Sequence, residues 1–433
     1  MPQTIFGRIG NLEKRSITAL QVTNKDIARV FARIGILSFG GPAAQISLMH
    51  HELVERRKWL GERQFMEALS FCMLLPGPEA MQLATYAGWR LRGVIGGLIA
   101  GLLFVLPGAL IMFGLAHGYA HFGHVPIVQD AFLGIKATVA IIVIQALAKL
   151  SSQTLTGWTG PVLALAAFIS IFILSIPFPA VIIVAGILGY AFGQSDGSAP
   201  AHQNVPFAKT CRTILFWGLL WFAPVAALWF AGQDLLFEIS VFFSKLALVT
   251  FGGAYAVLSY MTQAFANDFN WLSTPQMIDA LGLAETTPGP LILVTAFAAY
   301  LTGFFHYGET VAISAMLITL WVTFTPCFLW IFAGAPYMET LLSNPRLRQA
   351  LNAISASVVG VILNLSAWFA LHVLFSEVTP GKFGPAVEFS SFNFIPAALA
   401  LVAGFILVFA RLPMIPAMIA MALASAGIGI YLQ

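Results

Sequence analysis

Charged residues are scarce in this chain: they make up 9% of its 433 residues, whereas 59% are hydrophobic. A soluble globular protein carries about a quarter charged residues, so the composition excludes a large soluble domain. Apolar runs of about 20 residues, long enough to cross a bilayer, recur from one end to the other. The sequence therefore predicts an all-α polytopic membrane protein.

Cysteines and the common catalytic motifs are also few. Cys72, Cys211 and Cys327 lie in apolar surroundings without a CxxC spacing, which argues against a disulfide framework or a metal site. The chain has no phosphate-binding GxxxxGK loop, nucleophile elbow or HExxH motif, which excludes ATP-driven transport and the usual membrane hydrolases. A net charge of +3 is too small to indicate nucleic acid binding. No cofactor is expected, and the polar start of the chain predicts no cleavable signal peptide.

A stretch of forty residues occurs twice. The first copy runs from Phe39-Gly40-Gly41 to Pro76-Gly77-Pro78, and the second from Phe251-Gly252-Gly253 to Pro288-Gly289-Pro290. The copies align without a gap at an offset of 212, and 14 of the 40 aligned pairs are identical. The chain is therefore an internal duplication, whose offset grows to 219 after a short insertion in the second copy.

The duplication predicts five segments. They are a polar N-terminal segment 1–26, a first half 27–194, a linker 195–212, an extra transmembrane helix 213–235 and a second half 236–433. Each half holds two broken segments and then four continuous spans. Between a position in the first copy and its equivalent in the second, the chain also crosses the membrane through the extra helix, so the number of crossings is odd. The halves are therefore expected to be inverted relative to each other.

The distribution of cations predicts the orientation of the chain. Lysines and arginines gather before and after the first broken segment, which places the N-terminus in the cytoplasm and the C-terminus in the periplasm. The broken segments either cross the membrane or re-enter from one face, and re-entrant helical hairpins are the preferred interpretation.

Inverted repeats with broken helices are typical of secondary transporters. A break at mid-membrane depth exposes backbone N–H groups and the positive end of a helix dipole, both of which suit an anion. Lipid cannot satisfy these groups, so the breaks must line a protein-walled or watery cavity. One GG pair alone would indicate close helix packing. Two GG pairs and two PGP turns at a fixed offset favour a site for a small anion.

Two cations and two carboxylates lie near these breaks. Arg33 and Lys245 each precede a Phe-Gly-Gly by six residues. An intramembrane cation costs about 2.5–3.5 kcal/mol, so we expect the pair to face an oxyanion, with snorkelling to the interface as the alternative. Glu79 and Glu285 flank the PGP turns and are proton-coupling candidates, because burial favours the neutral form of a carboxyl group. Capping of a half-helix is the alternative for Glu79.

Three other charged residues carry weaker expectations. Lys136 is a third candidate for a buried cation, but its repeat partner is Ser355, so the duplication does not support it. Glu67 and Asp279 are repeat partners near the starts of their segments, and helix capping is expected of both.

Three motifs resemble those of the chromate ion transporter family. They are FGGPAAQ from Phe39 to Gln45, ERRKWL from Glu55 to Leu60, and LLPGPEAMQLA from Leu74 to Ala84. With the second copy, the resemblance covers nearly the whole chain, as in the long, two-half members. It implies efflux of chromate across the bacterial inner membrane, driven by the proton gradient or the membrane potential, with sulfate as a similar ligand. Met81 stands where the family pattern has a polar residue.

The predicted substrate site combines the two cations with the breaks and the polar residues of these motifs. It comprises Arg33, Phe39, Gly40, Gly41, Gln45, Pro76, Gly77, Pro78, Gln82, Lys245, Gly252, Gly253, Thr287, Pro288, Gly289 and Pro290. The residues alone indicate a secondary transporter of a small anion, and chromate comes only from the resemblance. Sulfate or another tetrahedral anion, or an anion channel, are the alternatives, and an enzyme is not expected. The expected partners are the oxyanion and the lipid bilayer; monomer and homodimer both stay open.

Overall fold

The computed structural model describes residues 22–155, 157–192, 207–251, 254–381 and 384–432. Six of its helices are long and apolar enough to cross a membrane. The expected all-α polytopic membrane fold is confirmed. One small feature was not expected: in the described residues, β1 (Val378–Gly381) and β2 (Gly384–Val387) form an antiparallel hairpin.

The first half begins with α2 (Asn24–Leu37), whose N-terminus is capped by the Thr23 hydroxyl accepting from the Asp26 N–H at 3.2 Å. Residues 24–26, predicted as part of the polar lead, therefore belong to this helix. The other elements of the half are α3 (Gly41–His50), the π-helical η1 (His51–Arg56), α4 (Glu62–Leu74), α5 (Glu79–Phe122), α6 (Pro126–Thr154), α7 (Thr159–Phe172) and α8 (Phe178–Ala191). The long α5 is kinked at Arg92 and Gly93, where the backbone is not helical.

The second half repeats this order after α9 (Phe207–Phe230). Its elements up to the second PGP turn are α10 (Asp234–Val249), α11 (Ala254–Gln263), the π-helical η2 (Ala264–Asp268) and α12 (Thr274–Thr286). Then come η3 (Leu291–Leu293), α13 (Val294–Tyr307), α14 (Glu309–Gly334), η4 (Ala335–Tyr337), α15 (Met338–Leu342) and α16 (Pro345–Leu374). After the hairpin, η5 (Phe389–Ser391), α17 (Phe394–Gly404), η6 (Phe405–Phe409) and α18 (Met414–Leu432) complete the chain.

The boundary predicted between linker and extra helix is wrong. The sequence predicts a linker that runs to residue 212, yet α9 already begins at Phe207, with Lys209 and Arg212 in its first turns. Long cationic side chains at the end of a membrane helix can reach the interface while their backbone stays helical. Residues 195–206, the rest of the predicted linker, lie outside the described part of the chain, as do residues 1–21.

The duplication is visible in fine details of the backbone. Lys58 and Asn270, which are 212 positions apart, both adopt the left-handed conformation, with φ of 54° and 51°. The next residue of each copy makes the same hydrogen bond: Trp59 N–H to the Leu53 carbonyl at 2.8 Å, and Trp271 N–H to the Phe265 carbonyl at 2.9 Å. The two copies therefore share one local structure between their broken helices.

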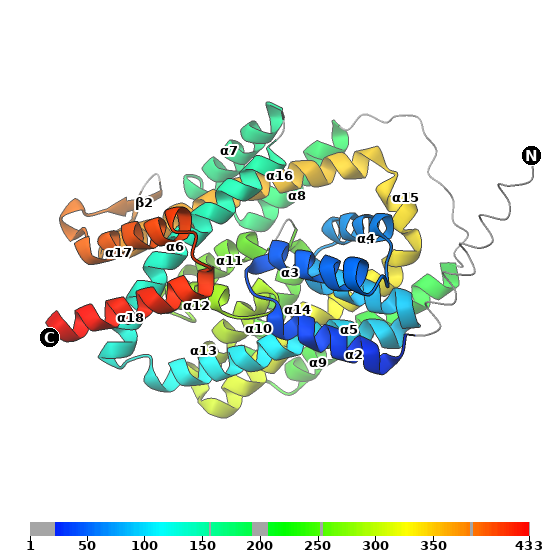
Figure 1. Cartoon of the computed structure of the whole chain (residues 1–433), viewed down its shortest axis with the longest axis horizontal. Coiled ribbons are helices and arrows are strands. Elements are labelled where there is room, and N and C mark those ends of the chain that lie inside the picture. Colours follow the sequence, from blue (N-terminus) through cyan, green and yellow to red (C-terminus); the bar gives the residue numbers. More distant parts are fainter. Residues whose placement is uncertain (1–21, 156, 193–206, 252–253, 382–383, 433) are drawn as a thin grey trace, which may run out of the picture.

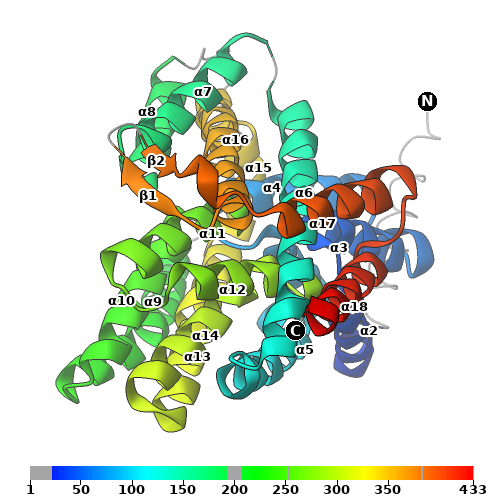
Figure 2. The same ribbon diagram turned by 90° about the vertical axis from the view of Figure 1, so that its left-hand side faces the viewer.

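Small residues bring the long helices together, as is usual in membranes. Gly35 of α2 lies against the backbone of Leu103 in α5, and a Cβ there would collide with it. Helix α14 is the most enclosed of the six long spans: 78% of its most apolar stretch is buried inside the protein. In α9, only 17% of the most apolar stretch is buried. Figure 1 shows α14 within the bundle, and Figure 2 shows α9 and α10 together along one edge of it.

Candidate functional site

The two halves exchange equivalent hydrogen bonds where their breaks cross. The Gly77 N–H of the first PGP turn donates to the Thr250 carbonyl, next to the second GG pair, at 2.8 Å. The Gly289 N–H of the second PGP turn donates to the Ser38 carbonyl, next to the first GG pair, at 2.9 Å. Reciprocal contacts of this kind are what a twofold relation produces. Gly252 and Gly253 themselves lie outside the described residues.

Each PGP turn also packs against a long helix from the opposite half. Gly108 of α5 lies so close to the Pro288 carbonyl that a side chain on it would collide. Cys327 of α14 is the repeat partner of Gly108, and its thiol lies beside Gly77 of the first turn. The crossing is therefore held by backbone contacts, with little room for larger side chains.

The first GG pair borders open space. Gly40 and Gly41 both have positive φ, of 86° and 73°, which L side chains rarely adopt. A Cβ on Gly41 would meet nothing within 4 Å, so the break leaves the start of α3 uncovered on this side. Phe39, just before it, is half-buried. An anion therefore has room to approach the backbone at this break.

Two buried glutamines reach the crossing from the first half. Gln45 Nε2 donates to the Gly289 carbonyl at 2.6 Å and lies 3.4 Å from the Ser38 carbonyl, so it links the two halves. Gln82 Nε2 donates to the Pro76 carbonyl at 2.7 Å. The Oε1 atoms of both are buried without a hydrogen-bond partner among the described residues. These amides are the side-chain polar groups that the sequence motifs placed at the breaks.

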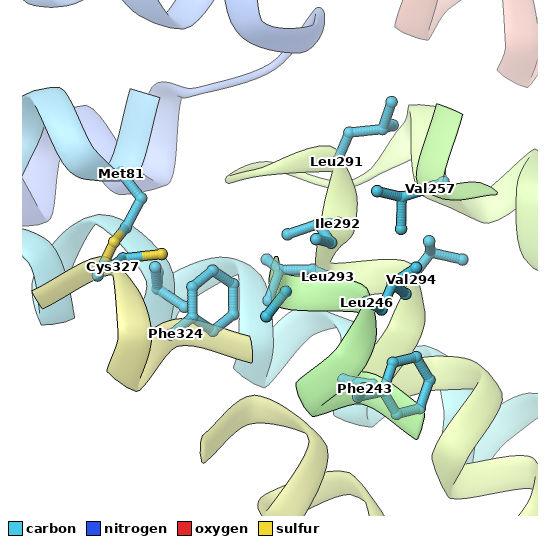
Figure 3. Close-up of a cluster of buried hydrophobic side chains, with 14 of the residues drawn as sticks. Met81, Phe243, Leu246, Val257, Leu291, Ile292, Leu293, Val294, Phe324 and Cys327 are labelled. Carbon is cyan, nitrogen blue, oxygen red and sulfur yellow. The ribbon is translucent and has the colours of Figure 1, made fainter. Parts of the chain in front are cut away.

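The second half is apolar at the matching positions. The repeat partners of Gln45 and Gln82 are Val257 and Val294, and Figure 3 shows both valines in a cluster of buried side chains together with Leu246. Met81, where a polar residue was expected, is fully buried and lies beside the Cys327 side chain. Of the two copies, the first therefore supplies the glutamine amides at the crossing.

The two proton-coupling candidates differ in their surroundings. Glu79 follows Pro78 directly as the first residue of α5, as predicted for a half-helix start, and is half-buried. Glu285 in the last turn of α12 is only 5% exposed, and the Tyr255 hydroxyl hydrogen-bonds to it. Thr287, next to the second PGP turn, is buried and donates to the Ala284 carbonyl at 3.2 Å. Pro290 ends that turn and precedes η3.

Each half of the chain matches a known protein family. The chromate transporter family model matches residues 25–190 and again residues 237–430, once in each half. The chain belongs to the chromate transporter family. It is 31% identical over 342 residues to the probable chromate transport protein of Synechococcus elongatus, covering 78% of this chain and 82% of that one. It is 32% identical over 341 residues to the chromate transport protein of Pseudomonas aeruginosa, covering 77% of each.

A shorter relative has about the length of one half. The uncharacterized transporter YwrB of Bacillus subtilis is 32% identical over 184 residues, which is 93% of that protein but 42% of this chain. The matched length is close to that of one half of this chain. No solved structure matches the chain.

Both symmetric cations have exposed side chains. Arg33 is 55% exposed on α2, and its Nη1 lies 4.0 Å from Glu52 Oε1; Lys245 on α10 is exposed as well. Both residues lie one turn or more before their breaks, on the outer side of amphipathic or mixed helices rather than on the buried side. The prediction that they bind the substrate was not tested by this observation and stays a prediction.

Arg33 belongs to a cluster around one buried carboxylate. Glu52, in the π-helical turn, is 4% exposed and also contacts Arg56 at 2.9 Å and Arg57 at 3.3 Å. Burial alone would raise the pKa of Glu52, but the guanidinium groups of Arg56 and Arg57 outweigh it and hold this pKa below its usual value. The cluster ties α2 to the turn between α3 and α4.

The capping role expected for Asp279 and Glu67 is wrong. Both lie inside their helices; α12 is capped instead by a box between Ser273 and Gln276. Asp279 is 7% exposed and pairs with Lys136, whose Nζ lies 2.8 Å from Oδ1. Glu67 pairs with Arg63 at 2.6 Å. The sequence held one usable signal, since Lys136 and Asp279 are opposite charges in otherwise apolar segments, but their positions are unrelated by the repeat.

Within the described residues, no group of three or more histidine, cysteine, aspartate or glutamate side chains is placed to hold a metal ion.

Proposed function

We propose that this protein is a secondary active transporter that exports chromate across the bacterial inner membrane. The observation that carries the proposal is the reciprocal crossing of the broken helices, Gly77 to Thr250 and Gly289 to Ser38, in a chain of the chromate transporter family. The crossing offers a tetrahedral dianion two kinds of donor, the backbone N–H groups at the first GG break and the Gln82 amide at the first PGP turn, and either would offset part of its dehydration. Two relatives bear the name of chromate transport proteins, which supports chromate as the cargo.

The experiment that tests this proposal is uptake of radiolabelled chromate into inverted membrane vesicles, with and without an imposed pH gradient. A transporter shows saturable uptake that accumulates chromate against its gradient, and excess sulfate competes with it. Uptake that rises linearly with chromate concentration and never exceeds equilibrium would indicate an anion channel instead. Vesicles that take up no oxyanion would contradict the proposal.

We propose Glu79 and Glu285 as the groups that couple protons to transport. Replacing Glu285 with glutamine keeps the hydrogen bond with Tyr255 but removes the titration, so chromate uptake driven by a pH gradient should fall about tenfold or more. Exchange of chromate across the membrane without a gradient should persist. Glu79→Gln tests the second candidate, and Glu238→Gln, on the exposed side of α10, is the control. Normal gradient-driven uptake by both variants would remove these residues from the proton path.

We further propose that the two halves are inverted, with the N-terminus in the cytoplasm and the C-terminus in the periplasm. The twofold relation at the crossing fits an axis in the membrane plane, as in other duplicated transporters. A reporter fused after Gly61 should then lie in the cytoplasm, and one fused after Asn270, in the matching loop of the second copy, in the periplasm. Two reporters on the same side would contradict the inversion.

A further inference from the structure

Two cavities in this fold are related by the repeat. The first, which we name the α5–α6 cavity, has a volume of about 480 Å³ and is lined by Tyr119, Gly123, His124, Gln129, Phe132, Lys136 and Asp279, among others. The second, the α4–α16 cavity, has a volume of about 690 Å³ and is lined at the matching positions by Met338, Leu342, Ser343, Arg348, Leu351, Ser355 and Glu67. Each of these seven pairs has the repeat offset of 212 or 219.

The cavities lie toward opposite sides of the molecule. In Figure 1, α12 and the junction of α5 with α6 lie to the left, whereas α4 and α15 lie to the right. Figure 2, seen from that left-hand side, has α12 and α18 in front and α4 behind. An inverted repeat that carries a cargo past one central crossing requires two such openings, one on each side.

The α5–α6 cavity contains a charge pair that joins the halves. Lys136 of α6 and Asp279 of α12 are 19% and 10% exposed, with Nζ and Oδ1 2.8 Å apart. The Tyr119 hydroxyl of α5 donates to the other carboxylate oxygen, Oδ2, at 2.7 Å. The Tyr119 ring is fixed by Phe132 and Phe297, with ring centroids 5.3 and 5.6 Å away. The Asp279 carboxylate therefore lies between two hydrogen-bond donors, Lys136 and Tyr119, in the lining of the cavity.

The α4–α16 cavity has a different arrangement of charges. Arg63 and Glu67 belong to one helix, four residues apart, and their side chains are 92% and 37% exposed. An exposed ion pair within one helix contributes little to stability. Ser355 stands where Lys136 stands in the other cavity. The duplicated protein thus carries a semi-buried inter-half ion pair in one of its two related cavities.

A semi-buried lysine needs an anionic partner, and in this structure Asp279 is that partner. A carboxylate with two oxygens held by an ammonium group and a phenol resembles one edge of a tetrahedral oxyanion. A dianion and the Asp279 carboxylate would repel each other at this place, so the two compete for Lys136 and Tyr119. Neutralising Asp279 with a proton removes that competition.

We propose that Lys136 and Tyr119 form a second oxyanion site, at the mouth of the α5–α6 cavity, which Asp279 occupies until it takes up a proton. The inference rests on the proposed oxyanion transport. Anion binding at this mouth site and protonation of Asp279 then favour each other, by the reciprocity of linked equilibria. One face of the transporter would therefore bind or release its cargo together with a proton, while the other face lacks this coupling.

Most other titratable groups near the Lys136–Asp279 pair contact other residues, and the effect of the remaining one can be tested by substitution. His124 lines the same cavity and is the neighbour to control for. Asp130 of α6 lies against Gly429 of α18. On α5, His117 lies 3.0 Å from the Tyr300 hydroxyl and 3.4 Å from Glu309, and His121 contacts the His117 carbonyl at 2.9 Å. On α13, His306 contacts the Thr302 carbonyl at 2.9 Å.

Equilibrium dialysis of radiolabelled sulfate against the purified full-length protein tests the mouth site. Sulfate stays a dianion between about pH 5.5 and 8, so its own titration does not interfere. We expect two bound sulfates at low pH, with the affinity of one falling up to about tenfold per pH unit as the pH rises. Asp279→Asn should keep both sites at every pH, and Lys136→Gln should keep one. Lys136→Arg retains the charge and should retain the second site.

A second readout follows the proton itself. In weak buffer, sulfate should draw about one more proton into the unmodified protein than into Asp279→Asn per mouth site filled. Glu67→Gln, at the repeat position, and His124→Gln are the controls and should leave this uptake unchanged. A single site in all variants, with equal proton uptake by the unmodified protein and Asp279→Asn, would overturn the mouth site and leave the proposed transport standing. Absence of any sulfate or chromate binding would overturn both.

Discussion

Replacing Gly108 with alanine should destabilise the protein by about 2–3 kcal/mol and abolish chromate uptake. The added Cβ would collide with the Pro288 carbonyl and also lie 2.6 Å from the Leu293 side chain. A side chain can rotate away, but the carbonyl belongs to the PGP turn whose next residue donates to Ser38. Relief therefore requires moving the second half relative to the first. The measurements are thermal unfolding of the purified variant and uptake into vesicles.

Helix propensity alone predicts the opposite sign for the change in stability. Alanine is better than glycine inside a helix by about 1 kcal/mol, so without the crossing the substitution would stabilise α5. Overpacking in a tight core costs about 1–3 kcal/mol, more where backbone must move. Gly114→Ala is the matched control, because a Cβ at this position of the same helix meets nothing within 4 Å. A Gly108→Ala protein as stable and active as Gly114→Ala would show that Gly108 and Pro288 are not in tight contact.

The breaks in the helices could be predicted because the sequence contains them twice. A duplicated break, with Gly77 and Gly289 at one offset, implies two copies of one local structure, and a glycine between prolines predicts a turn rather than a continuous helix. Gln45 and Gln82 could be named because they stand within the same motifs. What the motifs did not contain was the partner of each turn, since the contacts of Gly77 with Thr250 and Gly289 with Ser38 join residues that are far apart in the chain.

The charged residues were harder to place. Arg33 and Lys245 sit in largely apolar runs, but an apolar run does not say which side of a helix is covered, and both side chains are exposed. The repeat also gives wrong predictions where the two halves differ in sequence. The repeat partner of Lys136 is Ser355 and that of Asp279 is Glu67, so the duplication gives no reason to pair Lys136 with Asp279. Only tertiary structure brings Lys136 and Asp279 together, and it does so in one cavity of the pair.

Replacing Gln82 with glutamate should abolish oxyanion binding at the crossing, and Gln82→Val should weaken it about tenfold to a hundredfold. The amide nitrogen of Gln82 carries two protons, of which one is donated to the Pro76 carbonyl. Its other near neighbour is the Cys327 thiol, a weak hydrogen-bonding group that an oxyanion can displace. A hydrogen bond to a charged group contributes about 1.5–3 kcal/mol, and each 1.4 kcal/mol is about a factor of ten in affinity. Glutamate adds like-charge repulsion to that loss.

Valine is the informative replacement because the second half already has it at the matching position, Val294, where it is fully buried. The Pro76 carbonyl does lose its donor in Gln82→Val, so binding must be compared between proteins shown to be folded by their melting temperatures. Gln153→Val, on the exposed part of α6, controls for the loss of an amide elsewhere. Chromate and sulfate dissociation constants are measured for all three variants. If Gln82→Glu binds either anion within about twofold of the unmodified protein, Gln82 only supports the PGP turn, and the anion must bind through other groups at the crossing.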